Sequence, residues 1–198
     1  MKREEFQSVS LWAYKKVHEK GQVRRDSNPA TSHPGRVGII LNQKGLRHFN
    51  DDEEDYLYSL VAFCHDMIED EIATYEEIRE AISNICGEQI GKAVADRVQI
   101  LSKDPKLKND ETYLREVYIP EIERDEITRH VKIADRIDNV QKSSGLKNKK
   151  GYILETEWFL DLAKGTVFEE DLNQALEQLR KIVREEELRE SVAIGESR

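Results

Sequence analysis

The sequence predicts an all-α protein that folds as one helical bundle over residues 1–198. Apolar residues recur at three- and four-residue steps through most of the chain, as on one face of an amphipathic helix, and no segment shows the alternation of a strand. Only 10 glycines and 4 prolines interrupt the chain, and several of them fall where a helix would begin or end. We therefore expect a single helical domain in which residues 191–198 are frayed.

Several residues mark where the helices should begin and end. Pro34 suits a first turn because it lacks the N–H that a helix start leaves unpaired, and Gly45 suits a stop. Thr74 followed by Glu77 predicts a capping box, and Pro120 predicts an interruption. The expected helices cover residues 4–20, 33–44, 51–68, 74–87, 88–102, 112–118, 121–142, 152–164 and 168–190.

Composition limits the partners and the compartment. The formal net charge of −9 argues against general nucleic-acid binding, although a local group of Lys and Arg can still hold a small anionic substrate. No segment approaches the roughly 20 apolar residues that a membrane-spanning helix needs. Cys64 and Cys86 form no CxxC pair, which favours a reducing compartment over a disulfide framework. We expect a cytoplasmic protein with neither a membrane nor a nucleic-acid partner.

Titratable residues gather in the segment HDMIED at residues 65–70. His65 and Asp66 end an otherwise apolar helix, and helical spacing would place Glu69 one turn from His65 and Asp70 one turn from Asp66. Burying these groups would be costly unless a cation or water lies among them. Taken alone, however, a His-Asp pair is more simply a solvated, acidic helix end.

Two other segments favour a metal site. His33 stands at a helix start, and Asp135, Asp138 and Asn139 share a helix face at steps of three and four. Two imidazoles and two carboxylates suit a first-row divalent ion such as Mn²⁺, Fe²⁺ or Zn²⁺ and leave positions open for water and substrate.

These residues resemble a known signature. The order H…HD…D is similar to that of the HD metal-dependent phosphohydrolases. The fuller pattern resembles the hydrolase domain of the RelA/SpoT family, and most of all the stand-alone small alarmone hydrolases, through HP at residues 33–34, HDMIED at 65–70 and VKIADRIDN at 131–139. The similarity runs from about residue 24 to residue 165. It implies an HD-type helical bundle that hydrolyses guanosine 3′,5′-bis(diphosphate) or its pentaphosphate to GDP or GTP and pyrophosphate.

The resemblance also implies a role for each site residue. The metal is usually Mn²⁺, with Fe²⁺, Zn²⁺ or another divalent ion as alternatives, and its ligands would be His33, His65, Asp66 and Asp135. Glu69 and Asp70 would be the catalytic pair that orients a water and moves its proton. The residues that would hold substrate are Arg24 against the base, Arg25 at a phosphate and Asn139 near the ribose. Without the resemblance, Arg24 and Arg25 are a solvated basic pair. The lysines of residues 103–108 are further candidates to hold an anion.

The chain departs from the family pattern on the expected substrate side. Where the family often has Tyr, His, Arg and Thr, this chain has Ala30, Asp138, Gln141 and Glu71. Where the stand-alone enzymes place an aromatic and a basic residue, it has Gly151 and Glu155. The metal-binding set is complete, so the departures bear on the identity of the nucleotide more than on hydrolysis.

Two alternatives stay open. Another HD phosphohydrolase, such as a nucleoside monophosphate phosphatase, would use the same metal set, although the basic pair nine residues before His33 favours the alarmone. The other alternative is a catalytically idle nucleotide sensor or partner-binding bundle. The four ligands and both acids count against it, because a non-enzyme has no evident need for all of them. The sequence does not indicate the oligomeric state.

Overall fold

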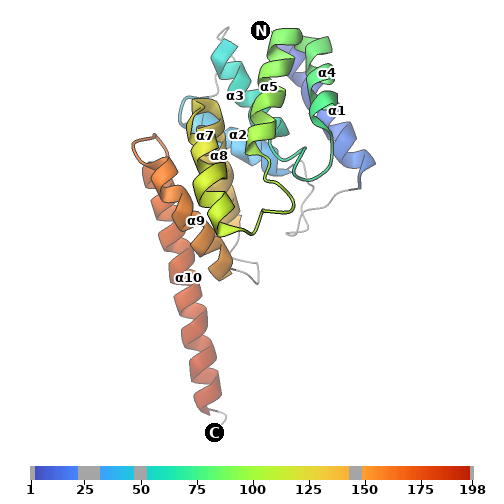
Figure 1. The fold of residues 1–198 in the computed structure, drawn as a ribbon. Coiled ribbons are helices and arrows are strands. Elements are labelled where there is room, and N and C mark those ends of the chain that lie inside the picture. Colours follow the sequence, from blue (N-terminus) through green and yellow to red (C-terminus); the bar gives the residue numbers. More distant parts are fainter. Residues whose placement is uncertain (1–2, 22–31, 47–52, 143–148, 197–198) are drawn as a thin grey trace.

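The structure, a computed structural model, describes residues 3–21, 32–46, 53–142 and 149–196. These residues form helices and no strand, which confirms the all-α prediction (Figure 1). No helix among them is both long enough and apolar enough to cross a membrane. The elements are α1 Arg3–Glu19, α2 Ser32–Gln43, α3 Glu53–Cys64, α4 Tyr75–Cys86, α5 Glu88–Leu101, α6 Glu111–Tyr113, η1 Leu114–Tyr118, α7 Ile119–Glu123, α8 Glu126–Lys142, α9 Lys149–Ala163 and α10 Glu169–Glu196.

Helix α8 lies at the centre of the bundle. It contacts α2, α3, α5, α7, α9 and α10, and nearly every residue between Ile127 and Val140 is buried. The buried residues include charged ones as well as apolar ones. The four charged side chains are those of Lys132, Asp135, Arg136 and Asp138.

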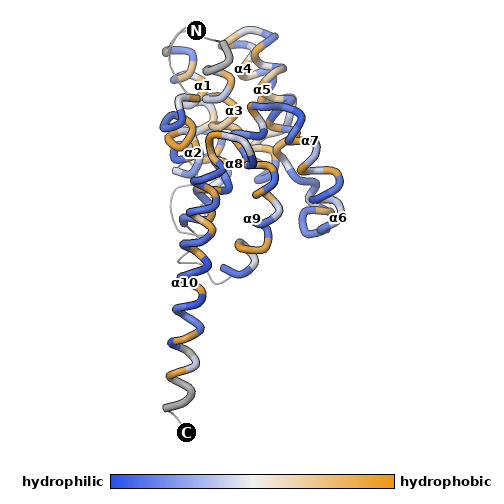
Figure 2. The backbone as a smooth tube through the Cα atoms, turned by 90° about the vertical axis from the view of Figure 1, so that its left-hand side faces the viewer, coloured by the Kyte–Doolittle hydropathy of each residue, from blue (hydrophilic) through white to orange (hydrophobic). Residues whose placement is uncertain are grey.

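The apolar core surrounds α8 and gathers side chains from most of the other helices. The largest fully buried ones are Phe159, Phe168, Leu41, Leu60, Ile78, Ile82, Leu101, Ile122, Ile133, Ile137, Leu162 and Leu172. A second, smaller cluster of Val140, Ala175 and Leu179 joins α8 to α10. Beyond this contact α10 extends away from the bundle, and its far half is mainly hydrophilic (Figures 1 and 2).

The capping box predicted at the start of α4 is confirmed. The backbone N–H of Glu77 donates to Thr74 Oγ1 at 3.2 Å, and the backbone N–H of Thr74 donates to Glu77 Oε2 at 2.9 Å. Two of the N–H groups that a helix start leaves unpaired are therefore satisfied locally.

The helix end expected near Pro120 is wrong. The break expected at Pro120 is displaced, because α6, η1 and α7 continue without a gap and the chain breaks at Arg124 and Asp125 instead. Residues of η1 form a π-helical turn, in which the N–H of Ile119 donates to the Leu114 carbonyl. This wider turn leaves Pro120 in the first turn of α7, where its missing N–H costs least.

The C-terminal part of the chain also differs from expectation. The backbone of α10 is helical to Glu196, so the described helix runs beyond the end expected at residue 190, while the fraying of the last residues stays a prediction. Residues 197–198 lie outside the described part. Ion pairs tie the middle of α10 to the start of α9, between Lys149 and Glu186 at 3.0 Å and between Lys150 and Glu187 at 2.5 Å.

Helices α4 and α5 pack closely at Gly91. A Cβ atom built there would lie 2.6 Å from the Arg79 carbonyl oxygen and 2.7 Å from the Ser83 backbone nitrogen, both on α4. Real Cβ atoms do not approach backbone atoms so closely. Because backbone cannot yield as a flexible side chain can, the two helices would have to separate to accept any larger residue.

We expect Gly91→Ala to lower the free energy of unfolding by about 1–3 kcal/mol, the usual cost of overpacking. Urea denaturation followed by circular dichroism measures it. Gly35→Ala on α2 is the matched control, because a Cβ there meets nothing within 4 Å and alanine is the better helix former. Equal urea midpoints for the two variants would contradict the close packing.

Candidate metal centre

The four predicted ligands meet at one point. His33 comes from the first turn of α2, His65 and Asp66 follow the end of α3, and Asp135 lies in the middle of α8. The Nε2 atom of His33 lies 3.2 Å from Nε2 of His65 and 3.0 Å from Oδ1 of Asp135. Oδ1 of Asp66 lies 3.1 Å from Nε2 of His65. The fold therefore brings together residues that are up to 102 positions apart in the sequence, from 33 to 135.

The second nitrogen of each imidazole is already hydrogen-bonded. Nδ1 of His33 lies 2.7 Å from Oδ2 of Asp138, and Nδ1 of His65 lies 2.8 Å from the Ala62 carbonyl oxygen. A carboxylate and a carbonyl can only accept, so each Nδ1 carries the hydrogen and donates. In a neutral ring this leaves the lone pair on Nε2, which is the atom that faces the other candidate ligands.

The donor set fits a divalent metal ion. One ligand atom from each of His33, His65 and Asp66 lies within 4.8 Å of the others, and Asp135 approaches both imidazoles. Nitrogen and carboxylate donors at this spacing repel one another unless a positive charge lies among them. Asp66 is the exposed member, with 28% of its side chain accessible, so the cluster opens toward solvent at this carboxylate.

The pKa values show how strongly the cluster attracts positive charge. Burial lowers the pKa of His65, but the adjacent Asp66 carboxylate, together with Asp135, outweighs it and raises the pKa to about 10. Burial also lowers the pKa of His33, but hydrogen bonds to Asp135 and Asp138 outweigh burial and raise the pKa above its usual value. Burial raises the pKa of Asp66, but His65 brings it down to about 2. The carboxylates of Asp66 and Asp135 therefore favour positive charge at this cluster.

Asp138 and Arg36 form a support for His33 that the sequence reasoning missed. Arg36 donates to Asp138 through both Nε, at 2.7 Å to Oδ1, and Nη2, at 3.0 Å to Oδ2. The carboxylate that fixes His33 is thus itself held by a bidentate pair. Burial raises the pKa of Asp138, but His33 and Arg36 hold it below its usual value. The only signal in the sequence is that Arg36 lies about one turn after His33.

The helix that was expected to carry Glu69 and Asp70 ends earlier than predicted. Helix α3 ends at Cys64, and the following residues form tight turns. Glu71 adopts a left-handed φ of 55°, which turns the chain away from the helix direction. One helical hydrogen bond remains, from the N–H of Asp70 to the Asp66 carbonyl at 2.9 Å. Glu69 is half-buried and its Oε2 accepts from the N–H of Lys103 at 3.3 Å, whereas Asp70 is exposed.

The predicted substrate residues are described only in part. Arg24, Arg25 and Ala30 lie outside the described residues. Asn139 lies on α8, and its Nδ2 donates to Oδ1 of Asp135 at 2.6 Å. It therefore orients the carboxylate oxygen that faces the two imidazoles. Its place near a ribose stays a prediction.

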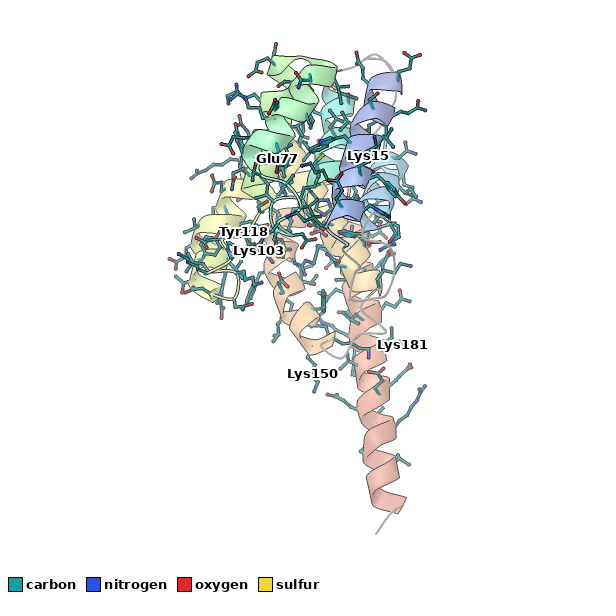
Figure 3. The ribbon with its side chains drawn as sticks, turned by 90° about the vertical axis from the view of Figure 1, so that its right-hand side faces the viewer. Lys15, Glu77, Lys103, Tyr118, Lys150 and Lys181 are labelled. Atoms are coloured by element: carbon teal, nitrogen blue, oxygen red, sulfur yellow. The ribbon has the colours of Figure 1, made fainter. Side chains whose placement is uncertain are left out.

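Two buried cations, Lys132 and Arg136, and one partly buried cation, Lys103, adjoin the metal cluster, and we call these three residues the basic cluster. Lys132 Nζ lies 3.0 Å from Oδ2 of Asp135, which links the basic cluster to a predicted ligand. Lys103 and Lys132 both lie over the ring of Tyr118, at 5.9 and 5.8 Å from its centroid, and Lys103 and Tyr118 lie side by side in Figure 3. Lys103 lies two residues after the end of α5, and only 11% of its side chain is exposed.

Sequence comparison connects these residues to named proteins. No family model matches the chain. The chain is 36% identical over 92 residues to the bifunctional (p)ppGpp synthase/hydrolase SpoT of Escherichia coli K12, covering 46% of this chain and 11% of the relative. It is 30% identical over 138 residues to a guanosine-3′,5′-bis(diphosphate) 3′-pyrophosphohydrolase of Aquifex aeolicus, covering 70% and 18%. The chain thus spans less than a fifth of the length of these two curated relatives.

Comparison with solved structures leads to the same group of proteins as the sequence comparison. A solved structure of a protein described as a metazoan ortholog of SpoT that hydrolyzes ppGpp superposes with a TM-score of 0.68 at 19% identity. The match covers 90% of this chain and 97% of that one, which shows a shared fold. The resemblance that the motifs predict is therefore confirmed: the chain is an all-helical protein that is similar in sequence and fold to RelA/SpoT-type hydrolases.

Proposed function

We propose that the protein is an HD-type phosphohydrolase that removes the 3′-pyrophosphate of guanosine 3′,5′-bis(diphosphate)-type alarmones, giving GDP or GTP and pyrophosphate. The observation that carries the proposal is the convergence of two imidazoles and two carboxylates on one point. The substrate class comes from the relatives, whose names specify (p)ppGpp. The free thiols of Cys64 and Cys86 support a cytoplasmic setting.

The ion would be held by His33, His65, Asp66 and Asp135. We propose Mn²⁺, because mixed nitrogen and carboxylate donors suit it, while Fe²⁺ and Zn²⁺ fit the same donors. When bound, such an ion supplies a Lewis acid that polarises a phosphoryl oxygen and lowers the pKa of coordinated water.

The chain's own residues would orient the reactants and move the proton. Glu69 presents a half-buried carboxylate that is anchored by the N–H of Lys103, and this carboxylate can accept a proton from the attacking water. Asp70 is exposed and one turn from Asp66, where it can pass that proton to solvent. Arg24 and Arg25 would hold the base and a phosphate, since a guanidinium can stack on one and pair with the other.

We expect Asp138→Asn to weaken Mn²⁺ binding about 10–100-fold, the usual effect of removing a group that orients a metal-binding histidine. The neutral amide no longer fixes the hydrogen on His33 Nδ1, and it loses the charge that pairs with Arg36. Titration with Mn²⁺, followed by the paramagnetic resonance of the free ion, measures the affinity. The control is Asp96→Asn on α5, whose carboxylate pairs with Lys92. Equal affinities in the two variants would remove Asp138 from the metal centre.

We expect Glu69→Gln to retain the metal and the fold but to lose about 10²–10⁴-fold in kcat, as when a proton-transfer group is removed. Single-turnover assays together with the Mn²⁺ content of the purified protein separate these effects. His65→Ala should lose the metal, and Glu71→Gln, two residues along, should behave as wild type. Loss of metal from Glu69→Gln would make Glu69 a ligand, and normal turnover would exclude it from the chemistry.

The experiment that tests the proposed function compares kcat/KM for guanosine 3′,5′-bis(diphosphate) and guanosine 5′-monophosphate, with Mn²⁺ present. We expect the 3′-pyrophosphorylated nucleotide to be far the better substrate. Arg24→Ala should raise KM more than it lowers kcat, because it removes binding shared by the ground and transition states, and Arg24→Lys should restore only part of it. A preference for the monophosphate would favour another HD phosphohydrolase, and hydrolysis of neither would favour a nucleotide sensor.

A further inference from the structure

Glu155 on α9 is shared by two members of the basic cluster. Its Oε1 atom accepts from Lys103 Nζ at 2.7 Å and from Arg136 Nη2 at 2.7 Å. A single oxygen thus joins the segment after α5 to α8. Two charge-assisted hydrogen bonds to one oxygen are also the pattern by which Lys and Arg bind a phosphate oxygen.

Lys103 and Arg136 are largely shielded from water, so they need Glu155 as a negatively charged partner. The side chains of Lys103 and Arg136 are 11% and 4% exposed, whereas that of Glu155 is 27% exposed. Glu155 is therefore the most exposed of the three side chains. The guanidinium of Arg136 is held over the ring of Phe159, 4.8 Å from its centroid, so it cannot easily turn to another acceptor.

The pair still has unused capacity to donate. Within the described part of the chain, the buried Nε of Arg136 has no hydrogen-bond partner. Burial raises the pKa of Glu155, but Arg136 and Lys103 bring it down to about 2, so the carboxylate is charged at neutral pH. Glu155 is thus a fixed negative charge that both Lys103 and Arg136 share.

The shared carboxylate lies beside the candidate metal centre. Lys103 is joined to Glu69 through its backbone N–H at 3.3 Å. On α8, Arg136 directly follows Asp135, and Lys132 pairs with Asp135 at 3.0 Å. A phosphorylated nucleotide that reaches the metal ligands would therefore lie close to this pair of cations.

We propose that Glu155 is a specificity-determining residue: it acts as a built-in anion that occupies a phosphate position between Lys103 and Arg136 and so excludes a phosphate group of the substrate or product from this pair. This inference deepens the proposed function and rests on it for the phosphorylated nucleotide. Removing the charge of Glu155 should turn the pair into an anion-binding site that takes phosphate or pyrophosphate.

The test is the binding of inorganic pyrophosphate to the full chain, measured by calorimetry in EDTA so that metal-bound pyrophosphate does not contribute, and repeated with Mn²⁺. We expect Glu155→Gln to bind pyrophosphate at least about tenfold more tightly than wild type, because the anion gains two charge-assisted partners. The matched control is Glu157→Gln on the same helix, whose carboxylate pairs with Arg180 at 2.5 Å and which should bind as wild type. Glu155→Gln combined with Lys103→Gln should also return to the wild-type affinity.

Two results would overturn the proposal: a folded Glu155→Gln that binds no more tightly than wild type, or a wild type that already binds pyrophosphate tightly through Lys103. If Glu155→Gln does not fold in buffer, pyrophosphate should restore its helical circular dichroism by replacing the missing charge. A chain that stays unfolded in pyrophosphate contradicts the proposal. Because the measurement needs neither turnover nor a nucleotide, its outcome is distinguishable from failure of the proposed hydrolysis.

Discussion

A charged helix is buried at the centre of the bundle, and ion pairs join it to the elements around it. Helix α8 is covered by six other helices, yet it carries Lys132, Asp135, Arg136 and Asp138 among its buried residues. An unpaired charge in such surroundings would cost several kcal/mol, so each of these groups needs a partner. The partners come from α2, from α8 itself, from α9 and from the turn after α3. The pairing that lets α8 be buried is therefore the same pairing that assembles the candidate site.

Much of the fold could be predicted because its rules are local. The three- and four-residue steps of apolar positions gave most helices, and the Thr74 capping box marked one start correctly. The helix break expected at Pro120 was misplaced because no spacing rule indicates a π-helical turn. The π-helical turn at residues 114–118 puts Pro120 in the first turn of α7, where its missing N–H costs little. The end of α3 at Cys64 was missed for a similar reason, since the turn after it depends on contacts of the folded chain.

The candidate site was predictable in its residue types but not in its supporting contacts. His33, His65, Asp66 and Asp135 follow a recognisable order, and the fold brings them together. Glu155 could not be assigned, because a glutamate on a helix usually faces water and its partners lie 52 and 19 residues away. Sequence spacing describes neighbours along a helix, whereas these contacts join three separate segments.

The wide separation of the residues that meet at His33 has a consequence for how the protein folds. His33 and Asp138 are 105 residues apart, so their contact closes a long loop, whereas the α4–α5 pair forms from adjacent segments. The candidate centre is therefore complete only when α2, the turn after α3 and α8 have come together, and the unfolded chain offers no comparable site. A divalent ion that binds the native state alone would stabilise it by mass action. A higher free concentration of that ion would then raise the folded population of the protein.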